Sequence, residues 1–216
     1  SLTKHSHFYW LNFMGRGHTD YLIRSISWNN QSTRLAVGDN EGTIRVHTYD
    51  GEFLSPEPMI TIHTEWSNIT QITWSLDGVY LAAKSGRRDV GIWFSETGNN
   101  IDLPQMIDSI PVTALKWSPV NNTEIGFTSL TEGIIIWDVE TQTVNRAVPE
   151  VPLSNISWSQ SGKLAAASIG DLYIWEDSLL GEPLQITTLD DGRILSVDWS
   201  SDNESVVATG SSGDIY

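Results

Sequence analysis

The 216-residue chain contains no cysteine and carries a formal net charge of −15, from 12 Lys and Arg against 27 Asp and Glu. These values exclude disulfides and cysteine-ligated metal, and the acidity argues against direct nucleic-acid binding, which needs a basic surface. No apolar run approaches the ~20 residues of a membrane-spanning helix, so we expect no membrane insertion.

The negative charge is concentrated in the second half of the chain. Residues 1–100 hold 8 Lys and Arg against 10 Asp and Glu, a balance of −2, whereas residues 101–216 hold 4 against 17, a balance of −13. This half suits a basic peptide or a basic partner subunit, although acidic turn residues also serve solubility alone. Ser1–His7 lacks the apolar region of a signal peptide, and we expect an intracellular protein.

The first predicted element is a strand at Phe8–Phe13. Five longer segments follow, each with an apolar run ending in Trp, a polar turn, a second apolar run, a loop and a third run. These segments are Ile23–Asp50, Ile69–Glu96, Val112–Glu140, Leu153–Asp177 and Ile194–Tyr216. Their β-branched and aromatic residues, separated by Asn, Pro and Gly, predict three strands per segment.

Two aromatic series run through the five segments with a period of roughly 40–45 residues, the period of a propeller blade. The first-strand tryptophans are Trp28, Trp74, Trp117, Trp158 and Trp199. The third-strand series is His47, Trp93, Trp137, Trp175 and Tyr216. We expect the eight tryptophans in these series to be core residues.

The spacing of apolar residues within each first strand predicts a β-bulge. Ile23, Ile26 and Trp28 stand at i, i+3 and i+5, and the other four first strands repeat this spacing. A step of three inside a period of two is what one extra residue produces.

These features, with Trp137-Asp138, Gly17-His18 and the turns after Trp74 and Trp117, resemble the WD-repeat β-propeller family. The resemblance implies an all-β fold of four-stranded antiparallel blades, about five of them in this chain, within a single domain covering residues 1–216. The expected units are residues 14–56, 57–103, 104–146, 147–185 and 186–216.

The resemblance leaves two accounts of how the propeller is completed. Either Phe8–Phe13 is a closing strand of a five-bladed ring, or the chain is part of a longer propeller of about seven blades, because open arcs leave exposed sheet edges. We favour the longer propeller.

Six residues are expected to form a partner-binding rim. In this family the loops before the first strand and between the second and third strands share one face, and Trp, Tyr and Arg are enriched in interface hot spots. The candidates are Trp66, Asn68, Arg87, Arg88, Tyr21 and Arg24. Trp66 belongs to neither aromatic series, so we expect its removal to affect binding more than stability. The alternative is a solvated turn with one stray aromatic residue.

The sequence indicates no catalytic, cofactor-binding or metal-binding residues. It contains no Gly-x-Ser-x-Gly elbow, no phosphate-binding Gly-Lys-Ser/Thr loop and no His-Glu-x-x-His pair. We therefore expect a non-catalytic scaffold that contacts other protein subunits or peptides within a multi-protein complex, in the nucleus or cytoplasm, with the nucleus favoured. We do not expect a self-sufficient homo-oligomer.

Two alternative functions stay open. One is a reader of basic or modified peptides, such as histone tails, that uses the acidic half. The other is a propeller hydrolase with carboxylates around the central channel.

Overall fold

The computed structural model describes residues 21–216 except 87, 147–150, 177–180 and 189–192. The predicted strand at Phe8–Phe13 and the pair Gly17-His18 lie outside the described residues. The described chain is all-β apart from one short helix, α1 (Gln105–Asp108).

Four sheets of four antiparallel strands are followed by one of two strands. The first sheet contains β1 (Ile23–Trp28), β2 (Arg34–Asp39), β3 (Thr43–Thr48) and β4 (Ile60–His63). The second contains β5 (Gln71–Trp74), β6 (Tyr80–Ser85), β7 (Asp89–Phe94) and β8 (Asn100–Ile101). The third contains β9 (Val112–Trp117), β10 (Glu124–Ser129), β11 (Gly133–Asp138) and β12 (Val144–Arg146). The fourth contains β13 (Asn155–Trp158), β14 (Leu164–Ala167), β15 (Asp171–Trp175) and β16 (Gln185–Thr188). The last contains β17 (Ile194–Trp199) and β18 (Val206–Gly210).

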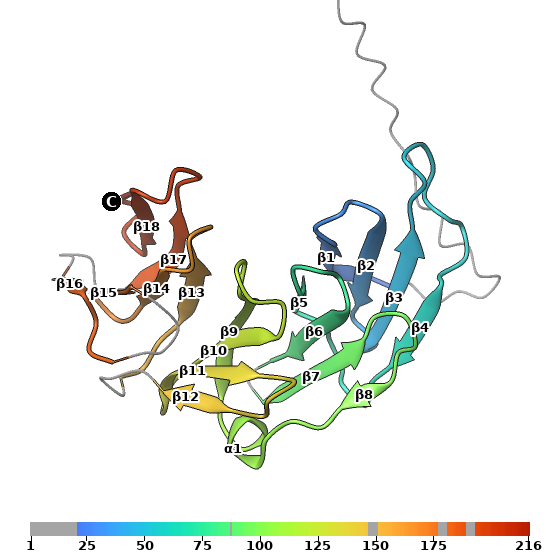
Figure 1. Ribbon diagram of the computed structural model, residues 1–216, viewed down its shortest axis with the longest axis horizontal. Helices are drawn as coiled ribbons and strands as arrows, with labels where there is room; N and C mark the ends of the chain where they lie inside the picture. Colours follow the sequence, from blue (N-terminus) through green and yellow to red (C-terminus); the bar gives the residue numbers. More distant parts are fainter. Residues whose placement is uncertain (1–20, 87, 147–150, 177–180, 189–192) are drawn as a thin grey trace, which may run out of the picture.

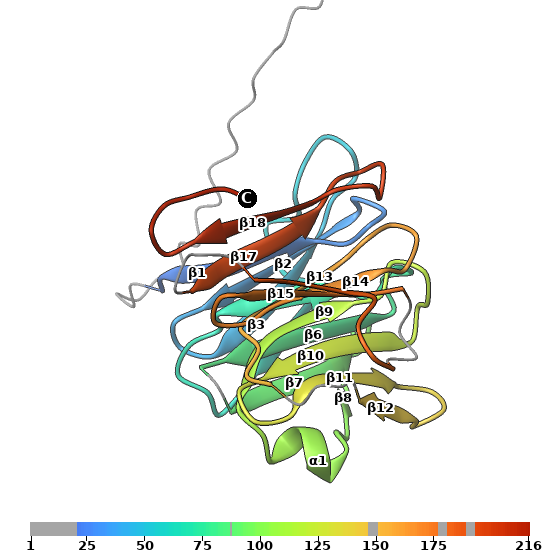
Figure 2. The same cartoon turned by 90° about the vertical axis from the view of Figure 1, so that its left-hand side faces the viewer.

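The five sheets follow one another along an arc, each packed face to face on the next (Figures 1 and 2). The first and the last sheet stand at the two ends of this arc (Figure 1). After β18 the chain turns back, and Tyr216 exchanges backbone hydrogen bonds with Ala208. An isolated bridge between Thr209 and Ile215 stands where the third strand was predicted. This all-β arrangement of sheets is that of propeller blades.

The predicted bulges are present in three first strands. The pairing register shifts between Ile23 and Ser25 in β1, between Ile194 and Ser196 in β17, and opposite Thr128 and Ser129 in the pairing of β9 with β10. Each shift brings the residues before and after it to the same face of the sheet, which explains the i, i+3 spacing.

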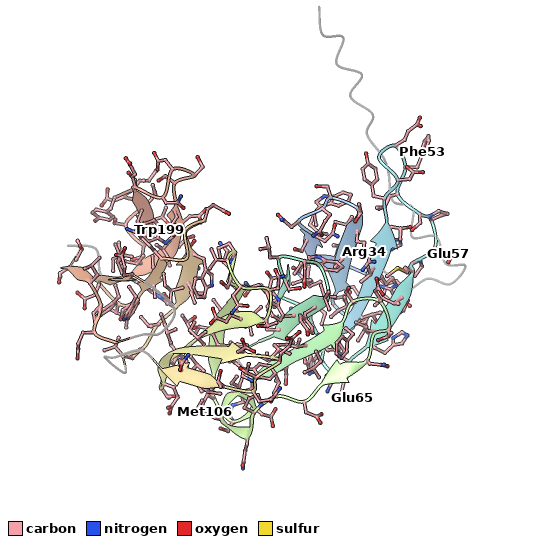
Figure 3. All side chains as sticks on the ribbon, in the orientation of Figure 1. Arg34, Phe53, Glu57, Glu65, Met106 and Trp199 are labelled. Atoms are coloured by element: carbon pink, nitrogen blue, oxygen red, sulfur yellow. The ribbon has the colours of Figure 1, made fainter. Side chains whose placement is uncertain are left out.

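The core lies between neighbouring sheets, where side chains fill the space (Figure 3). The first-strand tryptophan of one sheet packs against the preceding sheet. In three cases its indole N–H also donates to the backbone carbonyl one residue before the preceding sheet's tryptophan. The pairs are Trp74 to Ser27 (2.9 Å), Trp158 to Lys116 (3.2 Å) and Trp199 to Ser157 (3.2 Å).

The junction between the second and third sheets uses a different contact. Trp117 stacks on Tyr80 with ring centroids 5.5 Å apart, and its buried Nε1 has no acceptor among the described residues. The Gln71 side chain instead donates to the carbonyl of Leu115 (2.7 Å). The sheets are therefore joined by side-chain to backbone hydrogen bonds as well as by apolar packing.

The prediction that all eight tryptophans of the two series are core residues is wrong for Trp28. Its side chain is 46% exposed and Ile26 is 64% exposed, whereas Trp74 and Ile72, at the same positions of the second sheet, are 7% and 6% exposed. The reason is topological: Trp28 lies on the face at the end of the arc, where the described chain supplies no preceding sheet.

Candidate partner-binding surface

Trp66 lies in the loop between β4 and β5, and its side chain is half-buried. Its ring meets that of Trp93 edge-on, with centroids 5.7 Å apart, and it packs against the core between the first and second sheets. Gly91 makes room for this arrangement, because a Cβ there would lie 3.1 Å from the Trp66 ring. The expectation that Trp66 stands apart from the core is therefore wrong, since the loop folds the indole inward.

The loop that carries Trp66 is fixed to the first sheet. The Thr64 hydroxyl donates to the carbonyl of Gly42 (2.7 Å) and accepts the N–H of Trp66 (3.1 Å). Gly42 has a positive φ of 78°, and a Cβ on it would collide with the carbonyl of Trp66. Only glycine allows both the turn and this close approach.

Asn68 follows in the same loop and is partly buried. Its Oδ1 atom is buried and has no hydrogen-bond partner among the described residues. The next residue, Ile69, is fully buried between the sheets. Asn68 therefore marks the boundary between the loop and the core.

Tyr21 and Arg24 lie at the start of the first sheet and are both exposed. The Arg45 guanidinium stands over the Tyr21 ring at 5.1 Å, and the same guanidinium pairs with Asp39 (2.6 Å). Asp39 is fully buried and also accepts the N–H groups of Glu41 and Thr43. This buried ion pair has no signal in the sequence, because neither Arg45 nor Asp39 belongs to a periodic series.

Five of the six rim candidates lie within the described residues, and the contacts of Trp66 differ from those of Tyr21. Arg88 is exposed in the turn between β6 and β7, and Arg87 lies outside the described residues. No described contact joins Trp66 to Tyr21, Arg24 or Arg88. Trp66 contacts the core, while Tyr21 is held by Arg45.

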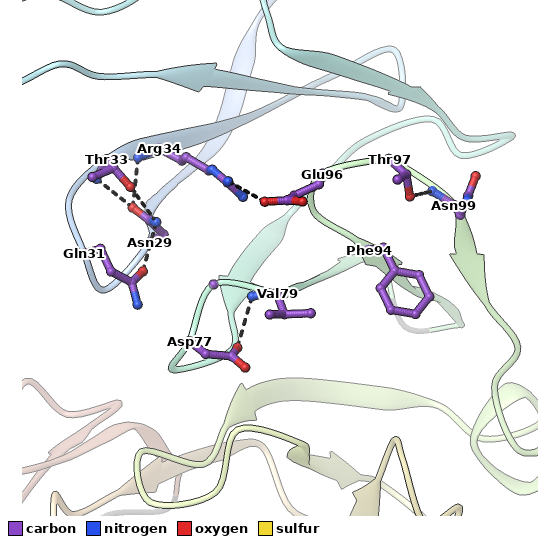
Figure 4. Close-up of a pocket in the computed structure, with 11 residues that line it drawn as sticks. Asn29, Gln31, Thr33, Arg34, Asp77, Val79, Phe94, Glu96, Thr97 and Asn99 are labelled. Carbon is purple, nitrogen blue, oxygen red and sulfur yellow. Dashed lines mark hydrogen bonds and ion pairs between the residues drawn. The ribbon is translucent and has the colours of Figure 1, made fainter.

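A pocket of about 480 Å³ opens at the edge of the first two sheets that lies opposite the Trp66 loop. Figure 4 shows the residues that line it. Three turns line it, those after β1, β5 and β7. Arg34 crosses from the first sheet to the second, donating to Ser95 (3.1 Å) and pairing with Glu96 (2.9 Å). The Gln31 side chain forms a second hydrogen bond between the two sheets, donating to the carbonyl of Leu76 (3.1 Å). No sequence motif indicates this pocket, because its residues come from turns of ordinary composition.

Two searches of the described residues bear on other functions. No group of three or more His, Asp or Glu side chains among them is arranged to hold a metal ion. None of their helices has the length and apolar character needed to cross a membrane.

Comparison with known proteins identifies similar sequences along most of the chain. Residues 11–48 match the family described as WD domain, G-beta repeat (WD40). The Protein LST8 homolog of Drosophila melanogaster is 27% identical in an alignment 210 residues long that covers 89% of this chain and 64% of that protein. The target of rapamycin complex subunit wat1 of Schizosaccharomyces pombe is 26% identical in an alignment 161 residues long that covers 68% of this chain and 49% of that protein. The chain thus spans less than two thirds of the length of either relative.

A solved structure has the same fold. The β-propeller domain of Myceliophteria thermophila Cps50 (Swd1) superposes with a TM-score of 0.67 at 16% sequence identity. The superposition covers 89% of this chain and 66% of that one. At this identity the likeness concerns the fold alone.

Proposed function

The chain belongs to the WD-repeat β-propeller family, and we propose that it is a non-catalytic scaffold that binds other protein subunits in a multi-protein complex inside the cell. The observation that carries the proposal is the similarity to wat1, which is by name a subunit of the target of rapamycin complex. A propeller is compatible with many functions, so this proposal rests on the relatives and on the surface rather than on the fold.

We further propose that the chain is part of a propeller of about seven blades. The chain covers 64% of the Drosophila relative, and the remaining length of that protein is enough for further blades. The exposed Ile26 and Trp28 support this view, because their counterparts in the other sheets are covered by a preceding blade.

The partner surface we propose is the edge formed by the loop before β5 and the turn between β6 and β7. The exposed Arg88 supplies a guanidinium group there, and a guanidinium binds a carboxylate with two parallel hydrogen bonds. Arg87 precedes it in the sequence and stays a predicted member of this surface. Trp66 and Asn68 give this edge a fixed base, because the loop is bonded to the first sheet. Tyr21 and Arg24 form a second, separate contact region.

The test uses the full-length parent protein with single substitutions and its purified complex. Arg88→Ala and Tyr21→Ala should each weaken partner binding, by about 2 kcal/mol or more if the residue is a hot spot. The control is Lys163→Ala, which removes one partly exposed positive charge, paired with Glu176 (3.3 Å), near the opposite edge in the turn after β13. If Arg88→Ala and Tyr21→Ala both left partner binding unchanged, the proposed partner surface would be wrong. Catalytic turnover by the purified protein would overturn the scaffold function if substitution of a single Asp or Glu abolished it.

A further inference from the structure

The pocket between the first two sheets, defined by the turns after β1, β5 and β7, has walls that are held in place. Asn29 is 5% exposed, and its Oδ1 atom accepts the N–H groups of Thr33 and Arg34, both at 2.9 Å. Its Nδ2 atom donates to Gln31 (3.0 Å) and to the Thr33 hydroxyl (3.1 Å). Such pre-organisation lowers the entropic cost of binding.

The pocket carries a negative charge with unused acceptor atoms. Its lining contains Arg34, Asp77 and Glu96, so its formal balance is one positive against two negative charges. Arg34 is neutralised by Glu96. The Asp77 Oδ1 atom accepts the Ser75 hydroxyl (2.7 Å) and the Val79 N–H (3.0 Å). Within the described residues, the second oxygen of each carboxylate has no hydrogen-bond partner.

Two exposed apolar side chains complete the pocket. Phe94 is 41% exposed and Val79 is 42% exposed, and both stand around the same space as the Asp77 and Glu96 side chains (Figure 4). The face of an aromatic ring attracts a cation, and an apolar wall suits the methylene stem of Lys or Arg.

We propose that this pocket binds a cationic side chain, Lys or Arg, presented by a segment of a partner protein. The proposal rests on the proposed scaffold function and adds a second contact site, on the edge opposite to Trp66. The stem of the side chain lies against Val79 and Phe94, and its charged head meets Asp77 and Glu96. The net charge of −15 favours the approach of such a basic segment.

An anionic ligand is the main alternative, because Arg34 also lines the pocket. The geometry disfavours it: the Arg34 guanidinium already donates to Ser95 and Glu96, and an anion would have to displace Glu96 while facing Asp77.

The experiment titrates the ¹⁵N-labelled full-length protein with three blocked amino acids and follows the amide resonances. The probes are the N-acetyl, N-methylamide derivatives of Arg, Lys and Glu. We expect saturable shifts in the turns after β1, β5 and β7 with Arg or Lys, and none with Glu. The shifts should shrink as salt is added, because exposed charge pairs are screened.

Isosteric variants then test the two carboxylates. Asp77→Asn and Glu96→Gln should each weaken binding about threefold, as expected of an exposed charge pair. The control is Glu65→Gln, an exposed acid on the opposite edge, labelled in Figure 3, which should bind as the unmodified chain does. Phe94→Leu keeps an apolar wall without the ring and should weaken binding while leaving the carboxylates in place.

Three results would overturn the proposal. These are equal shifts with the Glu derivative, shifts centred outside the pocket, or binding that is the same in the Asp77→Asn, Glu96→Gln double variant. The scaffold function would survive each of them, because it is tested through the rim variants and the purified complex. If instead only the scaffold function failed its test, the pocket would still bind the Arg derivative in the titration.

Discussion

Tryptophans of the two aromatic series have different environments, and this difference decides what each contributes. Trp137, of the third-strand series, is fully buried in the core between the second and third sheets. Trp28, of the first-strand series, is half exposed and touches Tyr49 edge-on at 5.3 Å. The contribution of a residue to stability therefore depends on whether a neighbouring sheet covers it.

We predict that Trp137→Ala lowers the free energy of unfolding by about 3–5 kcal/mol, as truncation of a buried aromatic residue does. Trp28→Ala in the same chain should cost only about 1 kcal/mol, because little apolar surface is lost from the core. Urea unfolding of both variants measures the difference. Equal losses would show that the face of β1 is covered in solution.

Asp138 ends β11 and accepts hydrogen bonds from three residues. Partial burial acts to raise its pKa, but the Thr141 N–H, the Thr123 hydroxyl and the Glu140 N–H outweigh burial, and the pKa lies below its ordinary value of 3.8. The Thr123 contact is 2.8 Å long, and the two N–H contacts are 2.8 and 3.0 Å.

A lowered pKa in the folded state means that the ionised carboxylate stabilises the fold. This stabilisation is fully present above the unfolded pKa of about 3.9 and is lost as the pH falls through the folded value. We therefore predict that Asp138→Asn destabilises the chain at neutral pH and that the difference disappears in acid. Unfolding curves across this range test it, and a constant difference would assign the effect to packing.

At the scale of elements, the loop before β5 is part of the inter-sheet core. The loop is bonded to Gly42 of the first sheet, and Trp66 fills the space over Gly91 of the second. Gly91 is thus a position where a side chain is excluded by its neighbours rather than by its backbone angles.

We predict that Gly91→Ala destabilises the chain by about 1–3 kcal/mol, the usual cost of overpacking. The new Cβ would lie 2.5 and 2.6 Å from two Trp93 ring atoms, so the aromatic pair must move. Gly181→Ala is the control, because a Cβ there would meet no atom within 4 Å. Equal thermal unfolding temperatures for Gly91→Ala and Gly181→Ala would contradict this packing.

At the scale of the whole molecule, each core cluster of the described residues joins two neighbouring sheets of the arc. Core clusters lie on both faces of the third sheet, whereas the first and last sheets each have one core cluster. Stability in such repeat arrays is the sum of unit and neighbour terms, so the two ends should open first.

We predict that, in the 216 residues expressed without further blades, amide hydrogen exchange is slowest in β10 and β11 and fastest in β17, β18 and β1. The comparison of β9 with β1 is the sharpest, because both are bulged first strands ending in Trp and differ mainly in whether a preceding sheet covers them. Exchange measured by mass spectrometry tests this gradient. Uniform protection across the five sheets would indicate a closed ring instead of an open arc.

The sequence alone was sufficient to predict the repeat, the three principal strands of the first four units and the first two of the fifth, and the bulges of β1, β9 and β17. These features arise from short-range alternation of apolar and polar residues and from a tryptophan that recurs at blade spacing. The bulges predicted in the other two first strands, β5 and β13, do not appear in their pairing registers. The fourth strands are weaker in the sequence: β8 has two residues and β12 has three, too few for a periodic pattern. They form because the edge of the third strand offers unpaired backbone groups.

Only the tertiary structure decided which repeated residues are buried and which surfaces are free. The arc leaves Trp28 exposed and covers Trp74, although both end a first strand. Trp66 turned inward because Gly91, 25 residues later in the chain, leaves room for its ring. The pocket at Asp77 and Phe94 likewise exists only because turns from two sheets meet. Periodicity specifies the strands within a blade, but contacts between blades depend on which sheets are present as neighbours.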